Sequence, residues 1–301
     1  MKTKTKIITF SSALILAALL TVGFVKIVQY MCRYGLNYTE TVKVDYENGE
    51  QWIIKNSEKV ETTSFDGLKL KACFVKNSIN SHKYGIFMHG YKDTPVKMED
   101  YGHHFYDKGW NIIIPGQRGH SWSEGTFIDM GFFARKDVLS WINYINQQDS
   151  EAEILLYGVS MGAATVMMAT GLSLPENVLC AVEDCGYTSI WDQFSYRLKK
   201  EFGLPSFPFL TVAEKIAEQK YGMDFHSISP ENQLPHSRTP TLFIHGTADD
   251  FVPYYMMDIL FKAAACEKEK VSIPDAKHAK SIYENPELYW QSVDSFVEKY
   301  F

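Results

Sequence analysis

Short apolar runs alternate with longer amphipathic stretches from residue 84 to the C terminus. The apolar runs have the length of strands, and the stretches between them have helical length and spacing. The predicted strands cover residues 84–88, 110–114, 153–157, 178–182, 241–244 and 270–273. The predicted helices cover residues 99–108, 132–147, 161–172, 254–266 and 286–300. Because helical crossovers join parallel strands, this alternation predicts an α/β fold with a mostly parallel central sheet and helices on both faces.

Two segments depart from this alternation. Residues 58–76 alternate polar and apolar positions around an Asp-Gly pair, which predicts an antiparallel hairpin. About fifty residues separate the strands at 178–182 and 241–244, too many for one helix with ordinary loops. We interpret residues 187–236, rich in aromatic side chains, as a small helical cap insertion over the C-terminal edge of the sheet. Ligands bind at that edge, so the aromatic residues either line an acyl or aryl pocket or only pack the cap onto the body.

The N terminus carries an apolar run, residues 7–25, that follows Lys2, Lys4 and Lys6. At about 1.5 Å per residue, a helix of this length spans the roughly 30 Å hydrocarbon core of a bilayer. The run exceeds the core of a cleaved signal, about 7 to 15 residues, and no small-residue cleavage site follows it. Residues 1–30 are therefore predicted to be a single-pass signal anchor. The leading lysines favour an extracytoplasmic domain after it; secretion after signal cleavage is the alternative.

Composition limits the classes of partner. The chain has 301 residues, 46% of them hydrophobic, which is enough for one large core with a modest insertion. Its formal charge is −6 and the basic residues are scattered, so no nucleic-acid partner is predicted. The five cysteines lack Cys-x-x-Cys spacing and fit neither a disulfide framework nor a zinc site. They are predicted to be small core residues, and no metal or cofactor is predicted. The oligomeric state is not indicated.

A serine lies at the junction of a predicted strand and helix, in the sequence Gly-Val-Ser-Met-Gly at residues 158–162. A serine flanked in this way is the signature of a nucleophile elbow, a tight turn that exposes the hydroxyl of Ser160 above the sheet. Gly and Ser are common, so the pattern alone is weak. A serine hydroxyl also needs a base within hydrogen-bond reach and a carboxylate that orients the base.

Two later strands supply these groups. Asp249 follows the strand at 241–244, and His278 lies in the loop after the strand at 270–273. The C-terminal ends of parallel strands meet at one edge of a sheet, so both side chains are expected on the side where Ser160 emerges. The pattern indicates a nucleophile, an orienting acid and a base, in that order.

These motifs resemble those of the alpha/beta-hydrolase superfamily. The resemblance extends from about residue 58 to the C terminus and includes residues 89–91, 117–121, 158–162, 245–253 and 275–278. It implies that Ser160 attacks an acyl carbon, that His278 carries the proton and that Asp249 orients the imidazole. It also implies an oxyanion hole formed by the backbone N–H groups of Tyr91 and Met161.

Two other carboxylates remain open as the orienting acid: Asp250, which is adjacent, and Asp184, which follows the preceding strand. The two residues between Asp249 and the next Val-Pro pair favour Asp249, because the superfamily has this spacing. The segment at 117–121 has Gln where the superfamily often has Asp. We interpret it as a structural loop in which Arg118 pairs with a carboxylate such as Asp137.

The sequence thus predicts a serine hydrolase that cleaves an ester or related acyl bond of a small-molecule acyl or aryl ester through an acyl-Ser160 intermediate, without a cofactor. An acyltransferase or a peptidase with the same triad is one alternative, and a non-catalytic membrane-tethered binding module on a hydrolase scaffold is another. The predicted organisation is a transmembrane signal anchor at 1–30, a linker with a short leading helix at 31–57, and an alpha/beta-hydrolase domain at 58–301.

Overall fold

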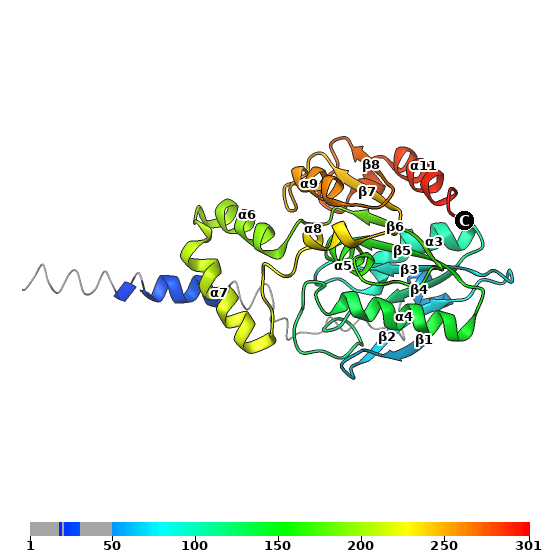
Figure 1. The fold of residues 1–301 in the computed structure, drawn as a ribbon, viewed down its shortest axis with the longest axis horizontal. Helices are drawn as coiled ribbons and strands as arrows, with labels where there is room; N and C mark the ends of the chain where they lie inside the picture. Colours follow the sequence, from blue (N-terminus) through cyan, green and yellow to red (C-terminus); the bar gives the residue numbers. More distant parts are fainter. Residues whose placement is uncertain (1–17, 20, 31–49) are drawn as a thin grey trace, which may run out of the picture.

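An eight-stranded sheet with the strand order β1-β2-β4-β3-β5-β6-β7-β8 organises the protein (Figure 1). The computed structural model describes residues 18–19, 21–30 and 50–301. The strands are β1 (Glu58–Thr63), β2 (Lys69–Val75), β3 (Lys83–Met88), β4 (Asn111–Pro115), β5 (Glu153–Val159), β6 (Val178–Asp184), β7 (Thr241–Gly246) and β8 (Lys268–Ile273). The helices are α2 (Trp52–Asn56), η1 (Pro95–Met98), α3 (Glu99–Asp107), α4 (Ala134–Gln148), α5 (Met161–Thr170), α6 (Ile190–Phe202), α7 (Ser206–Tyr221), α8 (Pro230–Gln233), η2 (Leu234–His236), α9 (Tyr255–Ala263), α10 (Ser281–Glu284) and α11 (Pro286–Val297).

The pairing of the strands confirms the predicted α/β fold class. Strand β2 pairs antiparallel with β1 and with β4, and every other neighbouring pair in the sheet is parallel. Strands β5, β6 and β7 each run two residues beyond their predicted ends. The two added residues are Gly-Val in β5, Glu-Asp in β6 and His-Gly in β7. Each pair contains a glycine or a polar residue, which interrupts the apolar run. Pairing with the neighbouring strand nevertheless extends through Val159 and Asp184.

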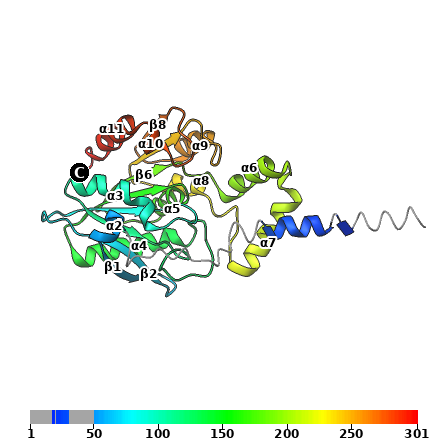
Figure 2. The same cartoon turned by 180° about the vertical axis from the view of Figure 1, so that it is seen from behind.

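The two faces of the sheet bury alternate side chains of each strand. Ile112 and Ile114 of β4 pack into the core under α2, α3 and α11, whereas Ile113 packs into the core under α4 and α5. Figure 2 shows these helices on opposite sides of the strands. A fully buried side chain of this size stabilises the fold by about 1.5–3 kcal/mol. Both faces are covered, which is why the parallel strands appear in the sequence as continuous apolar runs.

Helix α5 is enclosed by the rest of the molecule. All ten of its residues are buried, and it packs against β5, β6, α4 and α8. A helix without an exposed side has no polar stripe, and this accounts for its small apolar residues. The residue before α5 is Ser160, so the candidate nucleophile is attached to a rigid, fully packed helix.

Helices α6 and α7 project from the C-terminal edge of the sheet, within the segment predicted as a cap (Figure 1). Ser189 caps the N terminus of α6, where its hydroxyl accepts a hydrogen bond from the Asp192 N–H, and Gly203, with a φ of 66°, caps the C terminus. A helix at residues 21–30 lies beside α7, at the end of the cap that points away from the sheet (Figure 2).

The predicted signal anchor lies mostly outside the described residues. Among the helices that the structure describes, none is long and apolar enough to cross a membrane. The predicted linker is described only from residue 50, where α2 is the leading helix.

Arg118 is buried between two carboxylates. Its Nε lies 2.6 Å from Asp137 of α4, as predicted, and its Nη1 lies 2.9 Å from Asp66 in the turn between β1 and β2. Burial lowers the pKa of Arg118, but the two carboxylates outweigh it and raise the pKa above its usual value. The guanidinium thus ties the loop after β4 to the hairpin and to α4, which confirms the structural interpretation of this loop.

Candidate active site

Ser160 lies in a strained turn between β5 and α5, with φ of 57° and ψ of −117°. The two flanking glycines permit this turn. A Cβ atom at Gly162 would lie 1.9 Å from the Met88 carbonyl oxygen, and one at Gly158 would lie 2.3 Å from the Gly162 carbonyl oxygen. Any larger residue at either position would collide with backbone, so the turn has the local structure of a nucleophile elbow.

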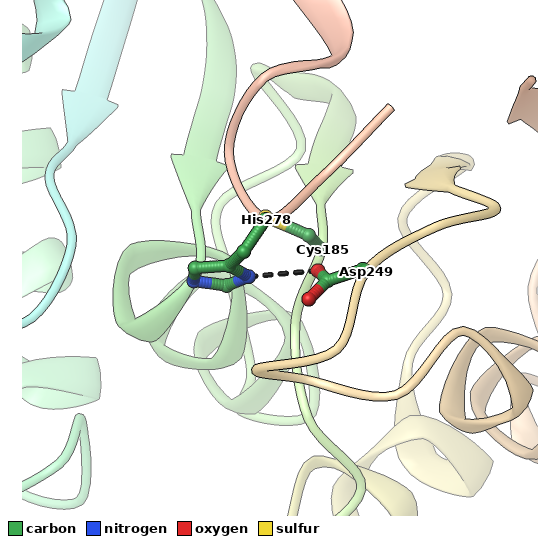
Figure 3. A group of neighbouring side chains, drawn as sticks. All are labelled: Cys185, Asp249 and His278. Carbon is green, nitrogen blue, oxygen red and sulfur yellow. Dashed lines mark hydrogen bonds and ion pairs between the residues drawn. The ribbon is translucent and has the colours of Figure 1, made fainter. Parts of the chain in front are cut away.

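The structure brings Ser160, His278 and Asp249 into one hydrogen-bonded chain. The Ser160 hydroxyl lies 2.9 Å from His278 Nε2, and His278 Nδ1 lies 2.7 Å from Asp249 Oδ2. Figure 3 shows the imidazole directed at the carboxylate. The three residues follow β5, β7 and β8, so the edge of the parallel sheet assembles groups far apart in sequence. This arrangement supports proton transfer from the hydroxyl to the imidazole.

Asp249 is held as a buried carboxylate. Its side chain is fully buried, and Oδ1 accepts hydrogen bonds from the N–H groups of Phe251 and Val252 at 2.9 and 3.0 Å. Burial alone raises the pKa of Asp249, but hydrogen bonds from His245 and His278 outweigh it and hold the pKa well below its usual range. The carboxylate is therefore charged at neutral pH and oriented by four donors.

His245 is a contact of the acid to which the sequence analysis assigned no role. Its Nε2 lies 3.2 Å from Asp249 Oδ2 and 2.9 Å from the Val252 carbonyl oxygen, and the side chain is fully buried. Burial lowers the pKa of His245, but Asp249 outweighs it and raises the pKa above its usual value. The sequence signal was the position of His245 at the end of β7, four residues before the acid.

The two competing carboxylates have other partners. Asp184 Oδ2 accepts a hydrogen bond from the Tyr289 hydroxyl at 3.0 Å, and burial raises the pKa of Asp184 to about 6. Asp250 is exposed and lies 2.8 Å from Lys200 of α6. Asp249 is thus the carboxylate, among these three, that hydrogen-bonds to His278.

Tyr91 and Met161 line the same cavity as Ser160. Met161 is the first residue of α5, so its N–H is one of the first-turn donors that lack an acceptor within the helix. A Cβ atom at Gly90 would lie 3.5 Å from the Ser160 Cβ atom, which places the loop before Tyr91 against the serine. Backbone donors at these two positions can face an oxyanion that develops beside the hydroxyl.

Buried polar contacts fix the loop that carries Tyr91. Burial lowers the pKa of His89 to about 3, so the ring is neutral. Its Nδ1 donates to the Gly90 carbonyl oxygen, and its Nε2 accepts from the Gln117 N–H. The Gln117 amide donates to the His89 carbonyl oxygen and accepts from the Thr165 hydroxyl of α5. Gln117 therefore joins the loop that carries Tyr91 to the helix that follows Ser160.

Ser160 lines an open cavity whose lining is almost wholly apolar. Residues from the loops, the cap and the helix at 21–30 line it: Tyr30, Tyr91, Met130, Ser160, Met161, Tyr187, Gln193, Phe194, Arg197, Leu198, Glu201, Phe202, Phe251 and Val252. The cap aromatics divide between the two predicted roles. Phe194 and Phe202 line the cavity, whereas Phe225, which is buried, packs the cap at 5.4 Å from the Phe194 ring.

Cys185 lies beside the Asp249–His278 pair (Figure 3), and its Sγ together with one ligand atom of each lies within 4.8 Å of the others. Burial raises the pKa of the Cys185 thiol, which disfavours the thiolate that a metal needs. A metal here would also displace the hydrogen bond between His278 and Asp249. The described cysteines are free and buried: Cys73, Cys180, Cys185 and Cys266.

Comparison with known proteins gives one family match and several relatives. Residues 80–202 match the family model described as serine aminopeptidase, S33. The chain is 26% identical to uncharacterized protein YqkD of Bacillus subtilis, over 86% of each chain. It is 24% identical to the alpha/beta hydrolase domain-containing protein WAV2 of Arabidopsis thaliana, over 81% of this chain and 79% of that protein.

Two solved structures with folds similar to this chain are an esterase and Est1E. The Pyrococcus furiosus esterase Pf2001 superposes with a TM-score of 0.70 at 20% identity, covering 87% of this chain and 99% of the esterase. Est1E of Butyrivibrio proteoclasticus, solved with ferulic acid bound, superposes with a TM-score of 0.61 at 20% identity, covering 80% of this chain and 99% of Est1E. With its sheet topology and the position of the serine turn, the chain has the alpha/beta-hydrolase fold.

Proposed function

We propose that the protein is a serine hydrolase that cleaves carboxylic esters through an acyl-Ser160 intermediate. One observation carries the proposal: a hydrogen-bonded chain runs from Ser160, which lines an apolar cavity, through His278 to a buried, charged Asp249. Nucleophile, base and orienting acid are all present at hydrogen-bond distance, which argues against a non-catalytic binding module.

In the acylation half of the reaction, Ser160 Oγ attacks the ester carbonyl carbon while His278 Nε2 takes the hydroxyl proton. The carbonyl oxygen becomes an oxyanion, which the N–H groups of Tyr91 and Met161 stabilise. The tetrahedral intermediate then expels the alkoxide, and His278 returns the proton to it as the alcohol leaves. Asp249 holds the imidazole in the tautomer that accepts at Nε2 and stabilises its charged form.

In the deacylation half, a water molecule attacks the acyl carbon of the intermediate and gives one proton to His278. The bond between the acyl carbon and Ser160 Oγ breaks, and the imidazole returns the proton to the serine. The products are one carboxylic acid and one alcohol. With an alcohol in place of water the same steps give acyl transfer, which is the second candidate activity.

The cavity favours an ester over a peptide with a free amino terminus. An aminopeptidase needs a carboxylate to bind the substrate ammonium group, and Glu201, the carboxylate in this lining, pairs with Arg197. The similar folds of an esterase and of Est1E with ferulic acid bound support an acyl or aryl ester as substrate. The acylaminoacyl peptidase of Pyrococcus horikoshii also has a similar fold, with a TM-score of 0.59, and this chain covers 40% of it.

We also propose that residues 7–25 anchor the protein in a membrane, with the hydrolase domain on the extracytoplasmic side. The apolar run and its leading lysines support this placement. Two measurements test this placement. An alkaline carbonate wash of membranes that contain the full chain tests whether the protein is anchored. Protease treatment of spheroplasts tests whether the hydrolase domain is on the extracytoplasmic side. Release of a shortened chain by the wash would instead show secretion after cleavage.

The test of the hydrolase function uses Ser160→Ala. We expect this variant to lose turnover of p-nitrophenyl butyrate by about 10⁴-fold or more and to lose labelling by a fluorophosphonate probe, because the members of a triad act as one unit. Circular dichroism checks that the variant is folded. Retained labelling would remove Ser160 as the nucleophile, and a product ester formed when methanol is added would show acyl transfer.

A further inference from the structure

The wall of the substrate cavity includes a residue from the N-terminal helix. Tyr30 lines the cavity together with Phe202 of the cap, and their ring centroids lie 5.8 Å apart. In the sequence, Tyr30 follows the apolar run at 7–25 by five residues. The chain that continues from the proposed membrane segment therefore forms part of the cavity that Ser160 lines.

The same helix packs firmly on the cap. Val28 is 3% exposed and belongs to the apolar cluster that contains Ala213 and Ala217 of α7. The Phe24 and Phe209 rings lie 5.0 Å apart, on the same pair of helices. The helix at 21–30 and α7 thus form one unit, which projects away from the sheet (Figure 1). Because α7 packs on this helix, α7 would lie close to the bilayer surface if the helix continues into a bilayer.

Large apolar side chains are exposed on this unit. Of the twelve exposed large hydrophobic residues in the described parts of the chain, seven lie on the N-terminal helix and on α6 and α7: Leu19, Val22, Val25, Tyr30, Phe202, Phe207 and Ile216. Phe207 is 74% exposed and Leu19 65%. Exposed apolar side chains gathered in one part of a protein mark contact with another apolar phase. The apolar run that leads into this helix identifies that phase as lipid.

We propose that the cap, together with the end of the helix that continues beyond residues 7–25, rests on the bilayer that holds those residues, and that the cavity takes esters of long acyl chains directly from it. This inference rests on the proposed hydrolase function and on the proposed membrane anchor, and it adds the substrate class. The apolar lining receives the acyl chain, and Ser160 in the same lining meets the ester carbonyl. Tyr30 and Phe202 line the cavity and are also exposed, so they mark the place where cavity and lipid meet.

The test compares two esters with the same fluorescent leaving group. The full chain is reconstituted in phosphatidylcholine vesicles and given 4-methylumbelliferyl oleate within the bilayer or 4-methylumbelliferyl acetate in the water phase. The variant Phe207→Glu/Ile216→Glu adds charge to the exposed face of the cap at positions that do not line the cavity. We expect a loss of at least 10-fold on the oleate ester and less than 2-fold on the acetate ester.

The control is Ile79→Glu, because Ile79 is 63% exposed but lies in the loop before β3, away from the cap. It is expected to change neither rate. An equal loss on both esters, an unchanged oleate rate, or the same oleate loss in the control would overturn the inference. Failure of the wild-type chain to hydrolyse the acetate ester would count against the proposed function itself, so the two failures are distinguishable.

A direct measurement of contact uses Phe207→Trp in the same vesicles, prepared with brominated phosphatidylcholine. The emission of the added tryptophan is obtained by subtracting the wild-type spectrum from that of the variant. This emission is expected to be at least twofold lower in brominated than in unbrominated vesicles, because bromine quenches tryptophan fluorescence. Emission that is unchanged by brominated lipid would show that the cap does not touch the bilayer.

Discussion

The sheet edge that carries Ser160 and the cap that covers it differ in how their residues are held. At the edge, each reactive side chain has several fixed partners: the elbow is enclosed by backbone, and Asp249 accepts from two N–H groups and two histidines. In the cap, apolar contacts predominate, and side chains such as Phe207 are largely exposed. Directional polar contacts hold the first region, and non-directional apolar contacts hold the second.

The difference suits the sheet edge to bond cleavage and the cap to selection of the acyl chain. Bond cleavage needs donors and acceptors held within a fraction of an ångström, which buried hydrogen bonds supply. Selection of an acyl chain needs apolar volume more than exact geometry. We therefore expect changes at the edge to affect every substrate alike, and changes in the cap to affect substrates according to the length of their acyl chains.

The largest expected effect concerns the orienting acid. Asp249→Asn should lower kcat/KM by about 10⁴-fold for acetate and oleate esters alike, because the amide favours the wrong imidazole tautomer. Asp250→Asn is the matched control, since its carboxylate is exposed and pairs with Lys200. Steady-state kinetics with both esters checks the prediction. A larger loss in the control, or a loss confined to one ester, would contradict the division between edge and cap.

The next effect concerns the cap lining. Phe194→Ala should lower kcat/KM for the oleate ester by roughly 10- to 100-fold, because one apolar side chain of a pocket contributes about 1–3 kcal/mol to discrimination. The acetate ester, whose short acyl group does not fill the cavity, should change less than threefold. The measurement is kcat/KM of the variant and the wild type over a series of esters that differ in acyl chain length. A loss that does not depend on chain length would count against the cavity as the acyl site.

A smaller effect is expected at His245. His245→Ala removes the donor 3.2 Å from Asp249 Oδ2 and the hydrogen bond to the Val252 carbonyl oxygen. We expect kcat to fall about 10-fold with KM unchanged, because a hydrogen bond to a buried charge contributes about 1.5–3 kcal/mol, part of which the remaining donors replace. An unchanged kcat in a folded variant would show that the other contacts of Asp249 orient it without His245.

The smallest effect is a pH dependence of stability at Glu183, behind the edge. Burial raises the pKa of this carboxyl to about 8, and its titratable neighbours are His245 and Asp184. Between about pH 4.3, where the unfolded chain loses the proton, and pH 8, the folded state keeps a proton that the unfolded state lacks. Stability from this group is therefore complete below pH 4.3 and declines as pH rises through the window.

Glu183→Gln removes this dependence, because an amide does not titrate. Its free energy of unfolding relative to the wild type should therefore rise as the pH increases from 5 to 8. Urea unfolding at the two pH values measures the difference. A constant offset between the two proteins would show that the carboxyl titrates alike in the folded and unfolded states.

Features that depend on neighbours along the chain could be predicted from the sequence alone. Strand and helix periods predicted the α/β sheet, since a parallel strand covered on both faces must be apolar throughout. The Gly-Val-Ser-Met-Gly turn identified Ser160, because only glycines fit where backbone approaches within about 2 Å. Strand ends stayed less certain, because pairing continues through polar residues such as Asp184.

Contacts between groups from distant segments became known only from the folded structure. The choice of Asp249 over Asp184 depends on loops after β6, β7 and β8, and on Tyr289 of α11, which occupies the competing carboxylate. The place of Tyr30 on the cavity wall has no local signal in the sequence. Such contacts follow from how whole elements pack in three dimensions, and the period of residues along one element does not contain that information.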